Sequence, residues 1–141
     1  SNTLISSASV GKQAEAQMAW LEKLLKVSAK RRYDHRTVYM HHPLFVRAAD
    51  EKDSYHNFPI KQRKRLLALL QDSGVEIAFS GNLLSYAYAR HGDLELITSA
   101  SCCLGGEKAG LRIVHVTPER NTEKFYPLDK MPEELSQMSI R

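Results

Sequence analysis

Two stretches with helical periodicity, each followed by a short apolar run, most constrain the fold of this chain. Apolar residues recur at helical spacing over residues 12–31, with charged residues between them, which predicts an amphipathic helix. A second helix is predicted to begin at Pro59, because proline suits the first helical turn. The runs at residues 37–41 and 75–80 have the composition of strands, and residues 3–6 predict a further short strand. Helices between successive strands imply right-handed crossovers and parallel pairing.

The rest of the chain predicts strands without intervening helices. Residues 94–99, 111–117 and 123–126 mix apolar and polar residues in strand-like fashion, and only turns separate them, so we expect antiparallel pairing. With residues 123–126 left aside as a candidate last strand, the predicted order is β-α-β-α-β-β-β, an α/β fold with a mixed sheet. At 141 residues the chain is at most one domain, which we place at residues 1–129, with a polar tail over residues 130–141.

Composition narrows the class of protein. The apolar runs are too short to span a bilayer, and the first residues lack the basic and apolar regions of a signal peptide, so no membrane contact is expected. Cys102 and Cys103 are adjacent and offer no disulfide framework, which favours a reducing compartment and a cytoplasmic location. The net charge of +4 would suit nucleic acid or an acidic partner surface. The basic run at residues 61–65, however, is typical of the solvated face of a helix, and no aromatic residues interleave with it, so nucleic-acid binding is unlikely.

A histidine ends the strand predicted at residues 37–41. Pro43 prevents the strand from continuing, which places the imidazole of His41 at a strand's carboxyl end. Open α/β sheets bind their ligands at such ends. Taken without any relative, a histidine there most simply bonds to the backbone. The strand at residues 75–80 ends in the same way with Gly81 and Asn82.

The order of these segments resembles the C-terminal half of the calcineurin-like metallophosphoesterase family. The segments that carry the resemblance span almost the whole chain and are Gln17-Met18-Ala19-Trp20-Leu21, His41-His42-Pro43, Phe79-Ser80-Gly81-Asn82-Leu83-Leu84, Gly110-Leu111-Arg112-Ile113-Val114 and Tyr126-Pro127-Leu128-Asp129. The resemblance is closest to the cytosolic calcineurin-like phosphoesterase-domain proteins, which are regarded as phosphoprotein phosphatases. It implies half of an α/β/β/α sandwich, in which two sheets pack face to face between helices.

The resemblance also bears on metal binding. The family uses two divalent metals (manganese, iron or zinc), about 3.5–4 Å apart, held by ligands from five strand ends. His41 matches the first histidine of the family's His-x-Pro segment, so the resemblance makes it an ancestral metal-ligand position. Asn82 and Leu84 stand where the family has the two histidines of Gly-His-x-His; Asn82 keeps a carbonyl oxygen and is a weak metal candidate, whereas Leu84 has no donor atom. The family's other ligand segments have no counterpart here, so we expect this chain to hold no cofactor and no catalytic residue.

Three hypotheses for function remain open. In the first, the chain is a degenerate or partial metallophosphoesterase domain, non-catalytic on its own, with a binding or structural role. In the second, it is the C-terminal half of an active metal-dependent phosphoprotein phosphatase whose other ligands lie upstream. A basic nucleic-acid-binding module is the minor alternative. Because half of a sandwich exposes an apolar face, we also expect a protein partner or self-association, through residues such as Leu96, Ile113 and Val116.

Overall fold

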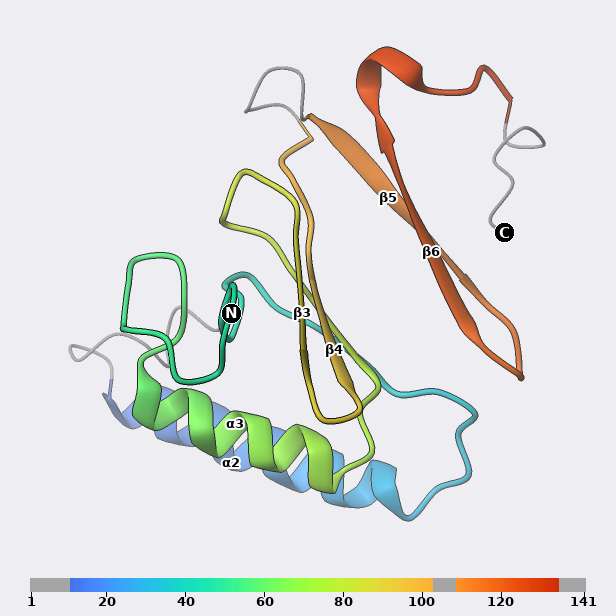
Figure 1. The fold of residues 1–141 in the computed structure, drawn as a ribbon. Helices are drawn as coiled ribbons and strands as arrows, with labels where there is room; N and C mark the ends of the chain where they lie inside the picture. Colours follow the sequence, from blue (N-terminus) through green and yellow to red (C-terminus); the bar gives the residue numbers. More distant parts are fainter. Residues whose placement is uncertain (1–10, 103–108, 135–141) are drawn as a thin grey trace.

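The computed structural model describes residues 11–102 and 109–134, and Figure 1 shows how they are arranged. In chain order the elements are helix α2 (Gly11–Ala29), strand β1 (Thr37–Tyr39), helix α3 (Ile60–Asp72), strands β2 (Ile77–Ser80), β3 (Ala87–His91), β4 (Leu94–Thr98), β5 (Gly110–Val116) and β6 (Asn121–Pro127), and the short helix η3 (Leu128–Lys130). Both predicted helices are confirmed, and α3 begins directly after its N-cap residue Pro59. The strand predicted at residues 3–6 and the end of the predicted tail lie outside the described residues. No helix in the described part of the chain has the length and apolar character needed to cross a membrane.

Four strands form one mixed sheet in the order β1-β2-β4-β3. β1 pairs with β2 and β2 pairs with β4 in parallel, which confirms the parallel pairing expected of the first two. The antiparallel pairing expected between β4 and the strands after it is wrong, because β4 pairs with β2 on one side and β3 on the other. β3 is absent from the sequence-based prediction. A two-residue turn containing Gly92, whose φ is +59°, joins it to β4.

The last two strands form a separate antiparallel hairpin, in register from Gly110 opposite Pro127 to Val116 opposite Asn121. The antiparallel pairing predicted for them is confirmed. In Figure 1 the hairpin lies beside the four-stranded sheet. Val114 of β5 packs against a small buried cluster on the sheet made of Ile77, Phe79 and Ile97. The hairpin therefore covers part of one sheet face.

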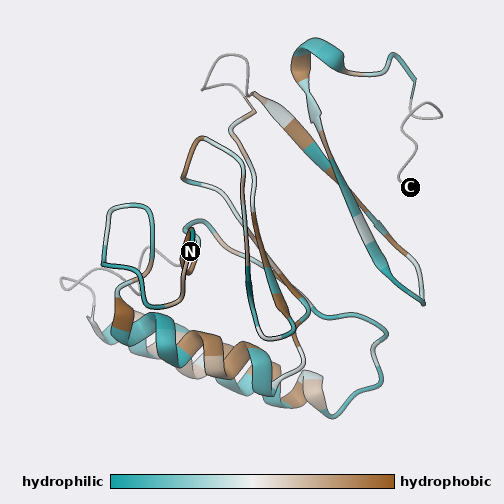
Figure 2. Ribbon diagram, in the orientation of Figure 1, coloured by the Kyte–Doolittle hydropathy of each residue, from teal (hydrophilic) through white to brown (hydrophobic). Residues whose placement is uncertain are grey.

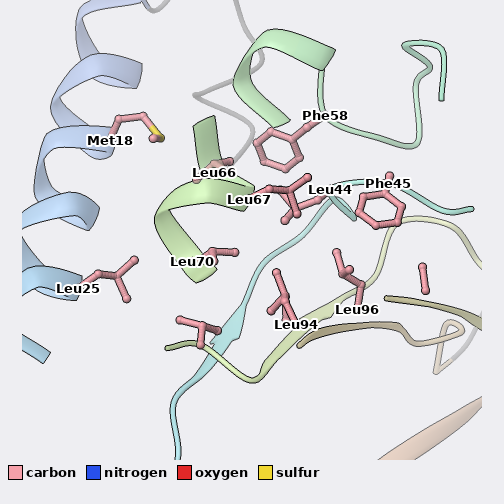
Figure 3. Close-up of a cluster of buried hydrophobic side chains, with 13 residues drawn as sticks. Met18, Leu25, Leu44, Phe45, Phe58, Leu66, Leu67, Leu70, Leu94 and Leu96 are labelled. Atoms are coloured by element: carbon pink, nitrogen blue, oxygen red, sulfur yellow. The ribbon is translucent and has the colours of Figure 1, made fainter. Parts of the chain in front are cut away.

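Helices α2 and α3 supply the main core on the other face of the sheet. Hydrophobic and hydrophilic residues alternate along both helices, as Figure 2 shows. The buried side chains that meet between helices, loop and strands include Met18, Leu25, Leu44, Phe45, Phe58, Leu66, Leu67, Leu70, Leu94 and Leu96, which are labelled in Figure 3. Leu96 is only 3% exposed in this core. The expectation that Leu96 contributes to an association surface is therefore wrong, because Leu96 lies in the core that α2 and α3 cover.

Candidate functional site at the strand ends

The carboxyl ends of β1 and β2 lie side by side, as the sequence predicts for parallel strands. The backbone N–H of Met40 donates to the carbonyl oxygen of Phe79 at 2.9 Å. One step further, the N–H of Gly81 donates to the carbonyl oxygen of His41, also at 2.9 Å. These bonds bring His41 next to the segment that contains Asn82. The two predicted candidate positions therefore belong to one edge of the sheet, which we call the strand-end edge: His41 and residues 81–84.

The backbone after β2 curls sharply through the left-handed region. Asn82 has a φ of +64° and Leu84 a φ of +58°, while the N–H of Leu83 donates to the carbonyl of Gly81 at 2.8 Å. Asparagine tolerates this conformation, but for leucine it costs about 1–2 kcal/mol because Cβ crowds the following carbonyl. The side chain of Leu84 is 49% exposed, so its burial does not offset that cost. The backbone of the turn is therefore strained at Leu84, where leucine does not favour the left-handed conformation.

The donor atoms at the strand-end edge do not make a metal site. Among the described residues, no group of three or more histidine, cysteine, aspartate or glutamate side chains is placed to hold a metal ion. His41 offers an imidazole, and Asn82 a carboxamide whose Nδ2 is buried without a hydrogen-bond partner in this part of the chain. A structural or catalytic zinc needs three or four ligands. The residues present therefore do not fit the family's pair of metals.

A chain of ring contacts leads from His41 into the following loop. The ring of His41 meets that of His42 edge to face, with centroids 4.7 Å apart. Tyr55 packs against His42 at 6.4 Å and against His56 at 5.3 Å. Burial lowers the pKa of His42, and the charges of His41 and His56 lower it further. The sequence did not indicate that these loop histidines gather here, since their contacts depend on how the loop folds back.

A buried arginine shapes that loop. Arg63 on α3 is fully buried and donates to the carbonyl oxygens of Phe58 (3.0 and 2.7 Å), Ala49 (3.0 Å) and Glu51 (2.7 Å). The interpretation of residues 61–65 as a solvated face is therefore wrong at Arg63. Its guanidinium satisfies loop carbonyls that have no strand partner, a role that the spacing of charges does not reveal.

The carboxylate of Glu51 organises the same loop from within. It accepts hydrogen bonds from the backbone N–H groups of residues 46–48, at 2.8–3.2 Å, and from Asn57 Nδ2 at 2.6 Å. Burial raises the pKa of Glu51, but these hydrogen bonds outweigh it and leave the pKa below its ordinary value. The loop beside the strand-end edge is thus held by internal polar contacts.

Comparison with known proteins places this architecture among characterised folds. No protein-family model matches the chain. The serine/threonine-protein phosphatase CPPED1 of Homo sapiens is 34% identical over 122 residues, which is 84% of this chain and 39% of the human protein. The CPPED1 proteins of Mus musculus and Danio rerio are each 33% identical over 83–84% of this chain. The chain spans under two fifths of the length of these curated relatives.

A solved structure shares the fold. GAP50, described as the anchor in the inner membrane complex of Plasmodium, superposes with a TM-score of 0.58 and 23% sequence identity. The match covers 77% of this chain and 33% of GAP50. At that identity it supports the fold alone, a mixed α/β arrangement.

Proposed function

We propose that this chain, which belongs to the calcineurin-like metallophosphoesterase family, is a degenerate part of that domain and does not hydrolyse phosphoesters on its own. One observation carries the proposal: the strand-end edge holds one imidazole and one carboxamide, and no metal-binding cluster is found in the described residues. A two-metal hydrolase needs several ligands to fix both ions and lower the pKa of the attacking water. The chain keeps the scaffold, and we assign it a binding or structural role.

The shape of the turn after β2 supports this interpretation. Asn82 and Leu84 hold the left-handed conformation at the two positions where the family has histidines. A leucine that is half exposed and strained stabilises neither the core nor the turn. A strained, half-exposed leucine is expected where a turn that once positioned metal ligands has lost those ligands but has kept its backbone conformation.

A second candidate is the C-terminal part of an active phosphatase. It is favoured by the relatives, which are named serine/threonine-protein phosphatases and are more than twice as long as the region matched. Ligands supplied by further chain would still meet Asn82 and Leu84 in place of two imidazoles. Loss of a residue that only supports a ligand costs roughly 10–100-fold in metal affinity or activity, so loss of two ligands should cost at least that.

Hydrolysis of p-nitrophenyl phosphate with manganese, iron or zinc tests the proposal. We expect no turnover above a blank that contains the metal alone. Turnover that disappears in His41→Ala would overturn the non-catalytic assignment and favour the second candidate.

Restoring the lost imidazoles tests the assignment of the edge separately. The double variant Asn82→His with Leu84→His should bind zinc measurably more tightly by calorimetry, because the new imidazoles lie beside His41. Val116→His is the matched control, since it adds an imidazole at an exposed position at the far end of β5. Equal zinc affinity in a folded double variant and in the control would show that these positions do not converge.

A further inference from the structure

Arg112 is a second arginine whose side chain is largely buried, and it lies away from the loop that Arg63 shapes. It projects from β5 with its side chain only 6% exposed. Its Nε–H donates to Ser99 Oγ at 3.0 Å, just past the end of β4. Its Nη1 forms an ion pair with the carboxylate of Glu123 on the neighbouring strand β6. The guanidinium thus bridges the hairpin and the four-stranded sheet.

One end of this guanidinium is left without an acceptor. Nη2 of Arg112 is buried and has no hydrogen-bond partner among the described residues. The rings of Tyr86 and Phe125 flank Cζ, with their centroids at 5.0 and 5.6 Å, but rings offer no lone pair in that plane. Burial lowers the pKa of Arg112, and the nearby Tyr86 opposes this shift only in part. A buried cationic donor in this state gains from any acceptor that reaches it.

A small cavity adjoins the arginine. It measures about 270 Å³ and is lined by Arg112 and Ser99 together with the largely apolar side chains of Tyr39, Met40, Phe79 and Val114. Tyr39 stacks on Phe79 with ring centroids 5.0 Å apart, which gives the cavity a flat aromatic wall. It lies where β1, β2 and β4, all parallel, reach their carboxyl ends, which is where open sheets bind ligands. Since ligand pockets for drug-sized molecules span roughly 300–1,000 Å³, this cavity suits a smaller molecule.

We propose that this cavity binds a small monocarboxylate with an apolar body. One carboxylate oxygen would accept from Arg112 Nη2 after a turn of the guanidinium, because Nη2 is closed to solvent in the present arrangement. The other would accept the hydroxyl proton of Ser99, which is free to point outward because Ser99 Oγ already accepts from Nε. The apolar body would lie against the Tyr39–Phe79 stack and Val114. This site adjoins the strand-end edge, since Met40 and Ser80 directly precede His41 and Gly81, but it shares no residue with that edge. Its test does not depend on the hydrolysis assay.

Charge selects a monoanion over a dianion. Glu123 already pairs with the guanidinium at Nη1, so every negative charge of a ligand meets the Glu123 carboxylate as well as the arginine. A phosphate dianion brings two negative charges next to that carboxylate, which is less favourable than one. A carboxylate brings one charge and two coplanar acceptor oxygens.

Titration with benzoate, followed by calorimetry and ligand-observed NMR, tests the proposal on the full chain. Benzamide has the same shape without the charge, and inorganic phosphate has the charge without the apolar body. We expect benzoate to bind at least about tenfold more tightly than either. Phosphate binding that is tighter than benzoate binding, or equal binding of benzoate and benzamide, would overturn the proposal.

Variants locate the site. Arg112→Gln should weaken benzoate binding about tenfold or more, and Ser99→Ala by a smaller factor, while Arg120→Gln in the exposed turn of the same hairpin should have no effect. If Arg112→Gln does not fold, the benzoate affinity of Ser99→Ala and the comparison of benzoate with benzamide still test the proposal. Unchanged affinity in a folded Arg112→Gln would show that the carboxylate binds elsewhere. A peptide with a free C-terminal phenylalanine, compared with its amide, distinguishes a polypeptide end from a free acid as the source of the carboxylate.

Discussion

At the residue scale, the buried side chain of Arg63 stabilises the loop that precedes α3. It is fully buried, and its donors satisfy the carbonyls of Ala49, Glu51 and Phe58. Replacing it leaves those acceptors buried without a partner, at about 1–3 kcal/mol each where water does not enter. We predict that Arg63→Met lowers the free energy of unfolding by about 3 kcal/mol or more, measured by urea denaturation.

The neighbouring residue supplies the control for that prediction. Lys64 lies on the exposed side of α3, so Lys64→Met should change the free energy of unfolding by no more than about 0.5 kcal/mol. Similar losses in the two variants would contradict the structural role given to Arg63. Asp53, whose carboxylate is 3.6 Å from Arg63 but 54% exposed, adds little to this stability through charge alone.

At the residue scale, the adjacency of the two strand ends was predictable and the partners of the arginines were not. The backbone bond from Gly81 to His41 confirms that the end of β1 lies beside the segment of Asn82, while metal binding by His41 and Asn82 stays a prediction. The roles of Arg63 and Arg112 were not predicted, because a charge pattern identifies solvated faces but carries no information about carbonyls or carboxylates that are distant in the sequence. Their partners lie in loops and in a hairpin, whose paths depend on the tertiary fold.

At the scale of elements, a histidine ties the β5–β6 hairpin to the body of the fold. His35 Nδ1 lies 2.8 Å from Glu76 Oε2, and Nε2 lies 2.7 Å from the carbonyl oxygen of Thr117 in the hairpin turn. Both partners are acceptors, so the imidazole satisfies both only when it carries two protons. Asn121 Nδ2, at the start of β6, donates to the same Glu76 oxygen at 3.2 Å and adds a second link between the hairpin and Glu76.

This contact makes the attachment of the hairpin depend on pH. The hydrogen bond to Glu76 raises the pKa of His35 above its ordinary 6.5; burial opposes the rise, while the Thr117 carbonyl and the charges of Glu76 and Asp34 add to it. A raised pKa in the folded state means that the stabilisation is complete below 6.5 and is lost as the pH rises through the higher folded value. We predict that amide protons of β5 and β6 exchange faster at about pH 9, relative to those of α3, than the pH dependence of intrinsic exchange explains. At about pH 6 their protection should return.

A variant without the titrating group checks this assignment. His35→Gln keeps a donor and an acceptor but should remove the pH dependence of hairpin protection. His42 shifts the opposite way, because its pKa is lowered and its contribution is lost as the pH falls, so His42→Gln should leave the alkaline effect in place. An alkaline effect that persists unchanged in His35→Gln would rule out this contact as its cause.

The helices and the first parallel strands were predictable because their apolar residues repeat at regular intervals. β3 was missed because Tyr88 and Arg90 are exposed and only Ala89 is buried, so its pattern resembles that of a loop. It forms a strand because the two-residue turn Gly92-Asp93 folds it back onto β4, a local hairpin signal that its weak strand pattern obscured.

For the molecule as a whole, the class of fold could be predicted and the strand order could not. Alternation of helices and strands is enough to specify a mixed α/β sheet. The position of β4 between β2 and β3 depends on a chain reversal through β3, and therefore on an element the pattern concealed. Leu96 is buried in the core beneath α2 and α3, where the sequence suggested a contact surface, whereas three apolar residues of α2 and Tyr39 on β1 are among the exposed ones.

Those exposed residues define where association is expected. Trp20 is the single tryptophan and is 60% exposed, and Leu24 beside it is 47% exposed. Both line a groove of about 980 Å³ between α2 and β1, which is an edge strand of the sheet that residues 11–102 form, and Tyr39 at the far side is 68% exposed. An open strand edge next to an apolar groove favours pairing with another chain, and a stable interface buries about 800 Å² on each partner.

We predict that the chain self-associates over the micromolar range through this groove. Because association would bury Trp20, its fluorescence maximum should move to shorter wavelengths as the protein concentration rises, in step with the mass from sedimentation equilibrium. Trp20 is needed as the probe, so the disrupting change is Leu24→Lys, which should keep the chain monomeric with the emission of an exposed indole. Tyr88→Lys on β3, which is also about half exposed, is the matched control and should leave association intact. A mass of 16.0 kDa at every concentration, with constant Trp20 emission, would mean that the groove does not bind a second copy.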